Sequence, residues 1–270
     1  MKKNLTIGFL ILILILPTIA GCSNQDANNK LTVGMELQYP PFETSNAVGE
    51  PEGISVDLAY ALGDYLGKEV EIQNIAWSGL IPAIQSGKID VILSSMSVRP
   101  DRAESVTFSK PYAQSTLAIL ANKNSNIKSA SDLNKDGVKV AVKVGTSGFL
   151  YANENLPKAT INTIDKADTG ILEVAQGKSD AFLYDQMSIY RSQLEYPDTT
   201  MAILEQFQED PEPWAMAVKL DNTELVNEIN AFIDDYQAKG GFDDLANKYL
   251  ADMKKTFDDL GLEFFFKPRD

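Results

Sequence analysis

The sequence predicts an α/β protein of two lobes, each a sheet flanked by helices. Short apolar runs rich in Val and Ile alternate with segments of helical periodicity, which is typical of largely parallel sheets. A block of helix, Gly-Lys and buried strand also occurs twice, as "IPAIQSGKIDVIL" at 81–93 and "ILEVAQGKSDAFL" at 171–183. Chance similarity is the alternative to a true repeat, because any helix-to-strand joint can use Gly-Lys. The length of 270 residues suits two ordinary domains.

The N-terminus has the order of a secretory signal. Lys2 and Lys3 precede an uncharged apolar run over 5–20. This run is shorter than the roughly 20 residues that a transmembrane helix needs. We therefore expect 1–21 to be a signal peptide and the mature protein to be exported.

Cys22 is the only cysteine of the chain and follows the small pair Ala20 and Gly21. A buried thiol is the alternative, but a cysteine in a polar stretch has no core to enter. "TIAGC" resembles the lipobox of bacterial lipoproteins, which implies that Cys22 carries lipid such as palmitate, and two acyl chains suffice for stable anchoring. We expect a protein anchored on the outer face of the cell membrane, or in the periplasm, with 22–30 as lipidated cysteine and tether.

The mature chain would be strongly acidic. Loss of Lys2 and Lys3 leaves 22 of the 24 Lys and Arg against 38 Asp and Glu, a net charge of −16. Such a surface repels nucleic acid and anionic lipid, so neither is an expected partner.

The first lobe begins with the strand "LTVGM" at 31–35. The two prolines of "QYPPFE" at 38–43 lack an N–H for a sheet, so this strand must stop by about Leu37. The stiff turn that follows presents Tyr39 and Phe42 from the carboxyl end of a strand. These rings either cap the core or belong to a site.

The next elements follow from periodicity. A helix is expected over 55–68, and the alternating run 69–75 predicts a strand. A short helix over 78–88 has Ser78 as its expected N-cap, and the apolar run 89–93 is the following strand. Four apolar side chains are expected on one face of the first helix: Leu58, Leu62, Tyr65 and Leu66.

Ligands of open α/β sheets bind beyond the carboxyl ends of the strands, so the segments after the two repeated strands are the expected place for a site. These segments are "SSMSVRPDR" at 94–102 and "YDQ" at 184–186. They supply hydroxyls, a guanidinium suited to a carboxylate and an acceptor suited to an ammonium. The residues are Ser94, Ser95, Ser97, Arg102 and Asp185.

A free α-amino acid carries both a carboxylate and an ammonium. "VGTSG" at 144–148 could aim backbone N–H groups at the same carboxylate from the start of a helix. Taken singly, Arg102 has an alternative as a surface ion pair, the serines as turn residues and Asp185 as a helix N-cap. Together, at equivalent strand ends, they favour an amino-acid site.

From about 31 to 250 the chain resembles the extracellular solute-binding proteins of polar amino-acid ABC importers. The pieces that carry the likeness come in family order: "YPPFE", "GISVDLA", "WSGLIPAIQSGKID", "SSMSVRPDR", "FSKPYA", "VAVKVGTSG", "DAFLYD" and "PWAMAVK". One departure is Ser55, where the family pattern usually has an acidic residue. Because Ser55 is expected on the approach to a helix, away from the ligand segments, we expect it to have no effect on the site.

The resemblance implies a type II periplasmic-binding-protein-like fold with a two-strand hinge. Lobe 1 would combine 31–113 with 212–250, and lobe 2 would span 114–211. A C-terminal extension would cover 251–270, with its aromatic "EFFF" at 263–266 packed on lobe 1 rather than forming a contact surface. The protein would be a monomer that closes on its ligand by a hinge motion and docks on the permease subunits of a transporter.

The resemblance also assigns roles within the site. Tyr39 and Trp77 would enclose the side chain of the ligand, and Phe42 would be the core residue that holds Tyr39 still. Ser97 and Asp185 would hold the α-ammonium. The α-carboxylate would be bound by a larger set of groups: Arg102 and the backbone of Ser95, Thr146 and Ser147.

Glu36 and Lys143 match family positions that contact the side chain of the ligand, and Glu43 loses this role to Glu36. An acid and a base together suit an amide, so glutamine is favoured slightly over arginine, lysine or histidine. The triple serine "SSMS" resembles the same segment in proteins that bind basic amino acids. Glu36 would attract such a cationic ligand, and Lys143 would repel it. Glu36 and Lys143 can also neutralise each other, in which case neither reads the ligand.

An enzyme is a lesser alternative, because the scaffold also resembles that of cyclohexadienyl dehydratases. The chain has no histidine and neither "GxxxxGK[ST]" nor "GxGxxG", so His-based triads, P-loops and classical dinucleotide sites are unsupported. Glu36 alone is a conceivable general acid. The acid pairs at 234–235 and 258–259 lack the spacing of a calcium loop. We expect no catalytic residue, metal site or cofactor, and a ligand-sensing receptor module is the other alternative.

Overall fold

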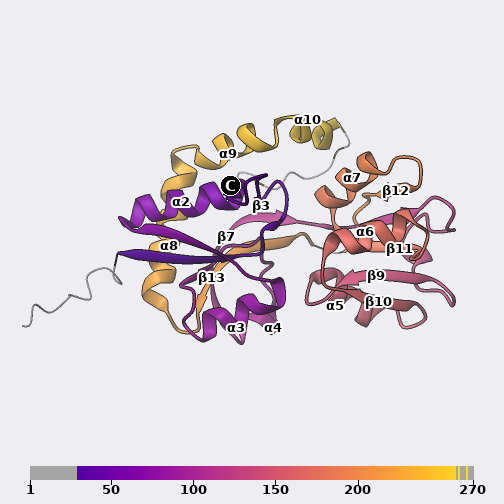
Figure 1. Cartoon of the computed structure of the whole chain (residues 1–270), viewed down its shortest axis with the longest axis horizontal. Coiled ribbons are helices and arrows are strands. Elements are labelled where there is room, and N and C mark those ends of the chain that lie inside the picture. Colours follow the sequence, from indigo (N-terminus) through magenta and orange to yellow (C-terminus); the bar gives the residue numbers. More distant parts are fainter. Residues whose placement is uncertain (1–28, 209, 260, 262–265, 267–270) are drawn as a thin grey trace, which may run out of the picture.

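Two five-stranded sheets organise the chain in the computed structural model, which describes residues 29–208, 210–259, 261 and 266. The predicted signal peptide, Cys22 and the tether up to 28 lie outside the described residues. The α/β architecture of two sheets flanked by helices is confirmed (Figure 1). Within the described part of the chain, no helix is both long and apolar enough to span a membrane.

The first sheet has the strand order β5-β1-β6-β13-β7. β1 runs parallel to β5 and β6, whereas β13 is antiparallel to β6 and β7. We call this sheet and its helices lobe 1. Its strands are β1 (Lys30–Met35), β5 (Glu69–Asn74), β6 (Val91–Ile92), β7 (Val106–Ser115) and β13 (Glu212–Lys219), and its helices are α2 (Ile54–Leu66), α3 (Leu80–Gln85), α4 (Pro100–Ala103), α8 (Thr223–Ala238) and α9 (Gly241–Tyr249).

The second sheet, of lobe 2, has the order β10-β9-β11-β8-β12. Its strands are β8 (Leu117–Asn122), β9 (Lys139–Lys143), β10 (Thr160–Ile164), β11 (Ala181–Asp185) and β12 (Thr200–Ile203), with the 3₁₀ turn η2 (Ala130–Asp132) and the helices α5 (Ser147–Asn155), α6 (Ala167–Ala175) and α7 (Gln186–Glu195). The two copies of the sequence block run along α3 into β6 and along α6 into β11, and each of these strands lies at the middle of its sheet.

Two crossings of the chain join the lobes. The first passes through Thr116, between β7 and β8, and the second lies between β12 and β13. β7 and β13 pair with each other as antiparallel neighbours and run toward lobe 2 side by side (Figure 1). The predicted domain boundaries at 113/114 and 211/212 stay predictions.

The first strand ends at Met35, and the chain then forms a small three-stranded sheet of β2 (Gln38–Tyr39), β3 (Glu43–Ser45) and β4 (Pro51–Glu52). Gly53 follows with φ +125°, and a Cβ there would lie 2.5 Å from the carbonyl oxygen of Phe42. Only glycine therefore allows α2 to start directly beneath this sheet.

Tyr65 of α2 is 46% exposed and packs its ring against Phe232, with ring centroids 5.6 Å apart. One sequence prediction for the helices of lobe 1 is wrong. Ser78 does not cap α3. It lies inside the 3₁₀ turn η1 (Trp77–Gly79), where the N–H of Gly79 already bonds to the carbonyl of Ala76 at 2.8 Å, so no side-chain cap forms.

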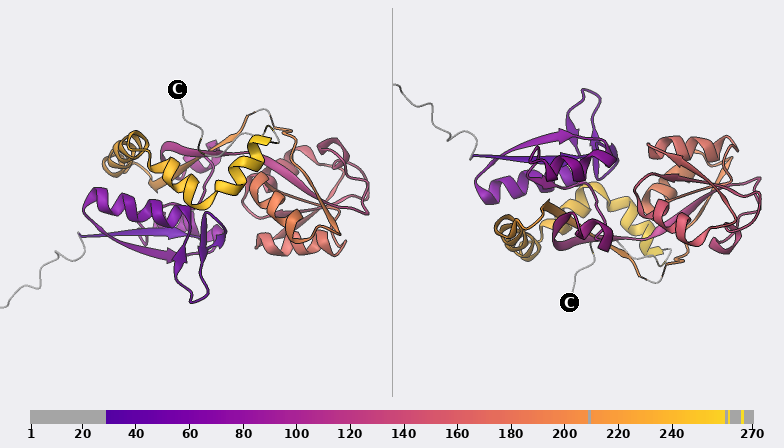
Figure 2. Two further views of the ribbon diagram at one scale, coloured as in Figure 1. Left: turned by 90° about the horizontal axis from the view of Figure 1, so that it is seen from above. Right: turned by 90° about the horizontal axis from the view of Figure 1, so that it is seen from below.

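The C-terminal extension contacts both lobes. Its helix α10 (Ala251–Asp259) buries Phe257 completely and places this ring against Tyr190 of α7, at a centroid distance of 6.3 Å. Phe266 returns to lobe 1 and stacks on Phe242 of α9 at 5.6 Å, which confirms the predicted packing for this one residue of "EFFF". Figure 2 shows α10 lying over the junction of the lobes.

Candidate functional site

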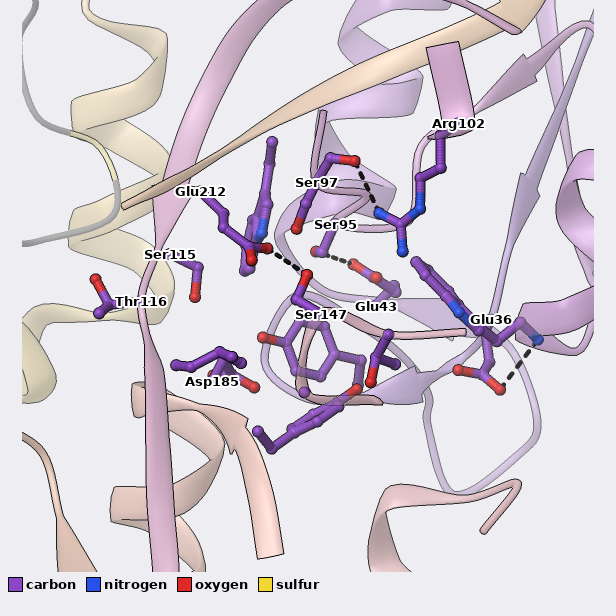
Figure 3. Close-up of a pocket in the computed structure, with 17 residues that line it drawn as sticks. Glu36, Glu43, Ser95, Ser97, Arg102, Ser115, Thr116, Ser147, Asp185 and Glu212 are labelled. Carbon is purple, nitrogen blue, oxygen red and sulfur yellow. Dashed lines mark hydrogen bonds between the residues drawn. The ribbon is translucent and has the colours of Figure 1, made fainter. Parts of the chain in front are cut away.

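A cavity lies where the two lobes meet, beyond the carboxyl ends of β6 and β11 (Figure 3). Most of the predicted site residues line it: Glu36, Tyr39, Trp77, Ser95, Ser97, Arg102, Thr146, Ser147 and Asp185. The other two, Ser94 and Lys143, are buried behind the wall and bond to residues that form it.

Arg102 supplies the positive charge of the cavity. Its side chain leaves α4 and is 5% exposed. It donates to the carbonyl of Ser97 at 2.7 Å and, across the lobes, to the carbonyl of Gly145 at 2.9 Å. Burial lowers the pKa of Arg102 to about 10, so the guanidinium remains charged at neutral pH. Its other N–H groups are available to a carboxylate.

The N-terminus of α5 lies on the opposite wall. A Cβ at Gly148 would lie 2.5 Å from the carbonyl oxygen of Leu183, so glycine lets this helix start close against β11. The N-cap Thr146 makes no side-chain cap and instead donates its hydroxyl to the carbonyl of Lys143 at 2.7 Å. The N–H groups of the first turn have no partner inside a helix, which makes this helix start a place for an anion.

Asp185 is the last residue of β11, and its two carboxylate oxygens differ in their hydrogen bonds. Oδ1 accepts the N–H of Ser188 at 2.9 Å and caps α7. Oδ2 is buried and accepts no hydrogen bond from any residue that the structure describes, while the whole residue is 7% exposed. Burial raises the pKa of Asp185, which the bond from Ser188 and the nearby Tyr39 hydroxyl oppose. Asp185 is therefore both a helix cap and an open acceptor that suits an ammonium.

Glu36 and Lys143 form a buried ion pair between the lobes. The carboxylate of Glu36 also accepts the N–H of Trp77 at 3.2 Å. The ammonium of Lys143 lies 5.7 Å from the centroid of the Trp77 ring. The structure thus has the arrangement in which the acid and the base neutralise each other.

Tyr39 is held by other aromatic rings. It stacks on Phe42 at a centroid distance of 5.1 Å and meets Tyr184 edge-on at 5.8 Å. Phe42 is buried in the core of lobe 1, as predicted. The ring of Trp77 lies 5.1 Å from the Arg102 guanidinium. Both Tyr39 and Trp77 line the cavity, and their contact with a ligand side chain stays a prediction.

The exclusion of Glu43 from the site is wrong. Its carboxyl is 1% exposed, lines the cavity and accepts three hydroxyls, from Ser55 at 2.6 Å, Ser95 at 3.0 Å and Ser94 at 3.2 Å. Burial raises the pKa of Glu43 to about 8, against the effect of these bonds. Glu43 is therefore mostly protonated at neutral pH, and it positions the serine segment after β6.

The expectation that Ser55 has no effect on the site is wrong as well, because Ser55 bonds to Glu43. Ser55 is buried at the start of α2, and its hydroxyl reaches the Glu43 carboxyl on β3. No local pattern marks this contact, because it forms only where the turn at Gly53 brings the start of α2 against β3.

The strands that join the lobes add cavity residues that the sequence did not indicate. Ser115 and Thr116 line it from the first crossing, and Glu212 lines it from the start of β13. The hydroxyl of Ser147 donates to Glu212. No motif marks these residues, because only the pairing of β7 with β13 brings them to the cavity.

The cavity combines donors for a carboxylate with an open acceptor for an ammonium. Among the described residues there is no cluster of His, Cys, Asp or Glu arranged to hold a metal ion.

Residues 31–252 match a protein family described as bacterial extracellular solute-binding proteins, family 3. The chain belongs to this family. Two known binding proteins are similar to most of the chain. The L-cystine-binding protein TcyJ of Escherichia coli is 29% identical over 228 residues, which are 83% of this chain and 84% of the relative. The glutamine-binding protein GlnH of Bacillus subtilis is 28% identical over 227 residues, 83% of this chain and 82% of the relative.

Solved structures of similar proteins confirm the predicted two-lobe binding-protein fold for this family 3 chain. An ancestral amino acid-binding protein, described as a precursor of cyclohexadienyl dehydratase, is 34% identical with a TM-score of 0.75, over 83% of this chain and 96% of the other. An ancestral arginine-binding protein bound to arginine is 31% identical with a TM-score of 0.76, over 82% and 98%.

Proposed function

We propose that the protein captures a free polar L-amino acid outside the cell and delivers it to the permease of an ABC transporter. The observation that carries this proposal is one cavity in which the Arg102 guanidinium and the start of α5 face the open oxygen of Asp185. These groups match the carboxylate and the ammonium of an amino acid. The binding proteins for cystine, glutamine and arginine to which the chain is similar support it.

In this proposal each wall of the cavity binds a different part of the ligand. Arg102 and the first-turn N–H groups of Ser147 and Gly148 bind the α-carboxylate. Asp185 and the Ser97 hydroxyl bind the α-ammonium. Tyr39 and Trp77 enclose the side chain, and the neutral acid-base pair behind them forms the floor. The remaining members of the site, Ser94 and Ser95, are held in place by Glu43.

Binding would favour the closed arrangement of the lobes. The Arg102 guanidinium and the Glu36–Lys143 pair already join the two lobes in this structure. A ligand between Arg102 and Asp185 adds contacts that exist only when the lobes are close, so it shifts the population toward the closed form. The closed form is the one that would dock on the permease.

The preference for glutamine depends on the Glu36–Lys143 pair. An amide binds there only by entering between two groups that bond directly to each other. Glutamine therefore stays a prediction beside arginine, lysine and histidine.

A calorimetric screen of the free amino acids tests the proposal. We expect at least one polar member to bind with a dissociation constant on the order of a micromolar or lower, about −8 kcal/mol. The protein should first be unfolded and refolded to remove any bound ligand. For each hit, the matching amine without the carboxylate and acid without the ammonium are controls and should bind far more weakly. The absence of heat with every amino acid would rule out amino-acid capture.

We further propose that Cys22 carries the lipid that keeps the protein at the membrane. Cys22→Ser should move the protein from the membrane fraction to the soluble fraction of the producing cells. Ser23→Ala is the matched control and should stay with the membrane. A Cys22→Ser protein that still sediments with membranes contradicts the lipid anchor.

A further inference from the structure

Three oxygen acceptors lie in a row where the strands cross between the lobes. Glu212 of β13 pairs directly with Ser115 of β7. Two residues further along the same crossing, Leu117 of β8 pairs with Asp185 of β11. Residues opposite each other on antiparallel strands have Cβ atoms about 5 Å apart, so Glu212 and Ser115 are neighbours, and Asp185 follows beside the next strand of the crossing. We call Glu212, Ser115 and Asp185 the acceptor strip.

The acceptor strip faces the cavity and is incompletely bonded. All three residues line the cavity, and Figure 3 shows Glu212 and Ser115 on the side away from Arg102 and Glu36. Ser115 is 8% exposed, and its hydroxyl has no hydrogen-bond partner among the described residues. Oδ2 of Asp185 has no such partner either.

Glu212 is bonded only by neutral groups. It accepts the Ser147 hydroxyl and, at 3.4 Å, the amide of Gln208. No Lys or Arg in the described part of the chain lies within ion-pair distance of it. It therefore has no direct ion-pair partner among the described residues, and the basic group on which its charge acts is the Arg102 guanidinium, whose pKa it raises.

The charges that face the cavity do not cancel. Glu36 is paired with Lys143, and Glu43 is mostly neutral because burial raises its pKa to about 8. Arg102 and Asp185 carry opposite charges and match the two ends of an amino acid. Glu212 is left over, so the cavity has one more acidic than basic side chain once the neutral Glu43 is set aside.

We infer that Glu212 determines specificity and that the ligand is an amino acid of net positive charge, with a second amino or guanidinium group. The inference rests on the proposed function and narrows it. The α-ammonium is a donor-only group that suits Asp185 and Ser115. A ligand whose only cationic group is the α-ammonium supplies one positive charge for the two carboxylates of the strip, Asp185 and Glu212. A ligand with a second cationic group supplies a positive charge for each of them.

The charge on Glu212 acts in a cavity that buried and half-buried side chains line, where a counter-charge has a larger effect than at an exposed surface. Arginine and lysine are therefore placed above glutamine as ligands. The repulsion from Lys143 is weak in this arrangement, because Glu36 already neutralises that ammonium.

Calorimetry with arginine, lysine and glutamine on ligand-free protein tests the inference. The variant is Glu212→Gln, which keeps an acceptor for the Ser147 hydroxyl and removes only the charge. Wild type should prefer arginine or lysine over glutamine by about tenfold or more, and Glu212→Gln should lower this preference by at least about tenfold by weakening the cationic ligand. Glu205→Gln removes an exposed charge from the same connection between β12 and β13 and should leave the preference unchanged.

The outcomes separate the inference from the proposed function. Wild type that prefers glutamine, or a preference that survives Glu212→Gln, overturns the role of Glu212 and leaves amino-acid capture in place. Wild type that binds none of the amino acids overturns both. Thermal unfolding of each variant accompanies the titrations, and binding of glutamine by Glu212→Gln shows directly that its cavity is intact.

Discussion

Arg102→Ala should reduce amino-acid binding by at least about a hundredfold, and to below detection where wild-type affinity is micromolar. The carboxylate of the ligand would enter a closed cavity without its charged partner, and an unpaired buried charge costs several kcal/mol. The guanidinium also bonds to Gly145 across the lobes, so its loss weakens the closed form in addition. Calorimetry with the best ligand of the screen measures the effect.

Arg102→Lys separates the charge from the shape of the side chain. Lysine keeps the charge but cannot bond to Ser97, Gly145 and a carboxylate in the same plane, so we expect an intermediate loss. Arg191→Ala removes an exposed arginine of α7 and is the matched control. Unchanged affinity of a folded Arg102→Ala or Arg102→Lys protein would falsify the assignment of the carboxylate site.

The sequence was sufficient for the parts of this protein that local chemistry determines. The repeated helix, Gly-Lys and strand block predicted that the segments carrying Arg102 and Asp185 follow the two central strands. Both side chains line the same cavity, because the carboxyl ends of these two strands face each other across it. The prolines near Tyr39 likewise fixed the end of β1 without knowledge of the rest of the fold.

The sequence was insufficient where function depends on pairing between distant strands. Glu212 lies at the cavity only because β13 returns beside β7, and no local pattern marks that pairing. Ser55 and Glu43 are twelve residues apart and meet through the turn at Gly53. The Glu36–Lys143 contact joins two lobes, so sequence left it as one alternative among others.

Glu43 should make the stability of the protein fall as pH rises from about 4.5 to about 8. The folded protein holds the Glu43 proton up to a pKa of about 8, whereas an unfolded chain releases it near the ordinary value of 4.5. Between these values the folded state binds more protons than the unfolded state, so the free energy of unfolding decreases with rising pH. The ceiling of this effect is about 5 kcal/mol, at about 1.4 kcal/mol for each pKa unit.

Urea unfolding of wild type and Glu43→Gln at intervals from pH 4.5 to 9 isolates this contribution. Glutamine resembles the protonated carboxyl in size and hydrogen bonding, so the two proteins should be nearly equal in stability at the acid end. The variant should then become more stable than wild type by several kcal/mol at the alkaline end, because it has no proton to lose from a site that is 1% exposed. Glu52→Gln, an exposed position on β4, should follow wild type throughout. Parallel curves for wild type and Glu43→Gln would show that Glu43 is ionised in the folded protein and that its three hydroxyl partners stabilise a charge rather than share a proton with it.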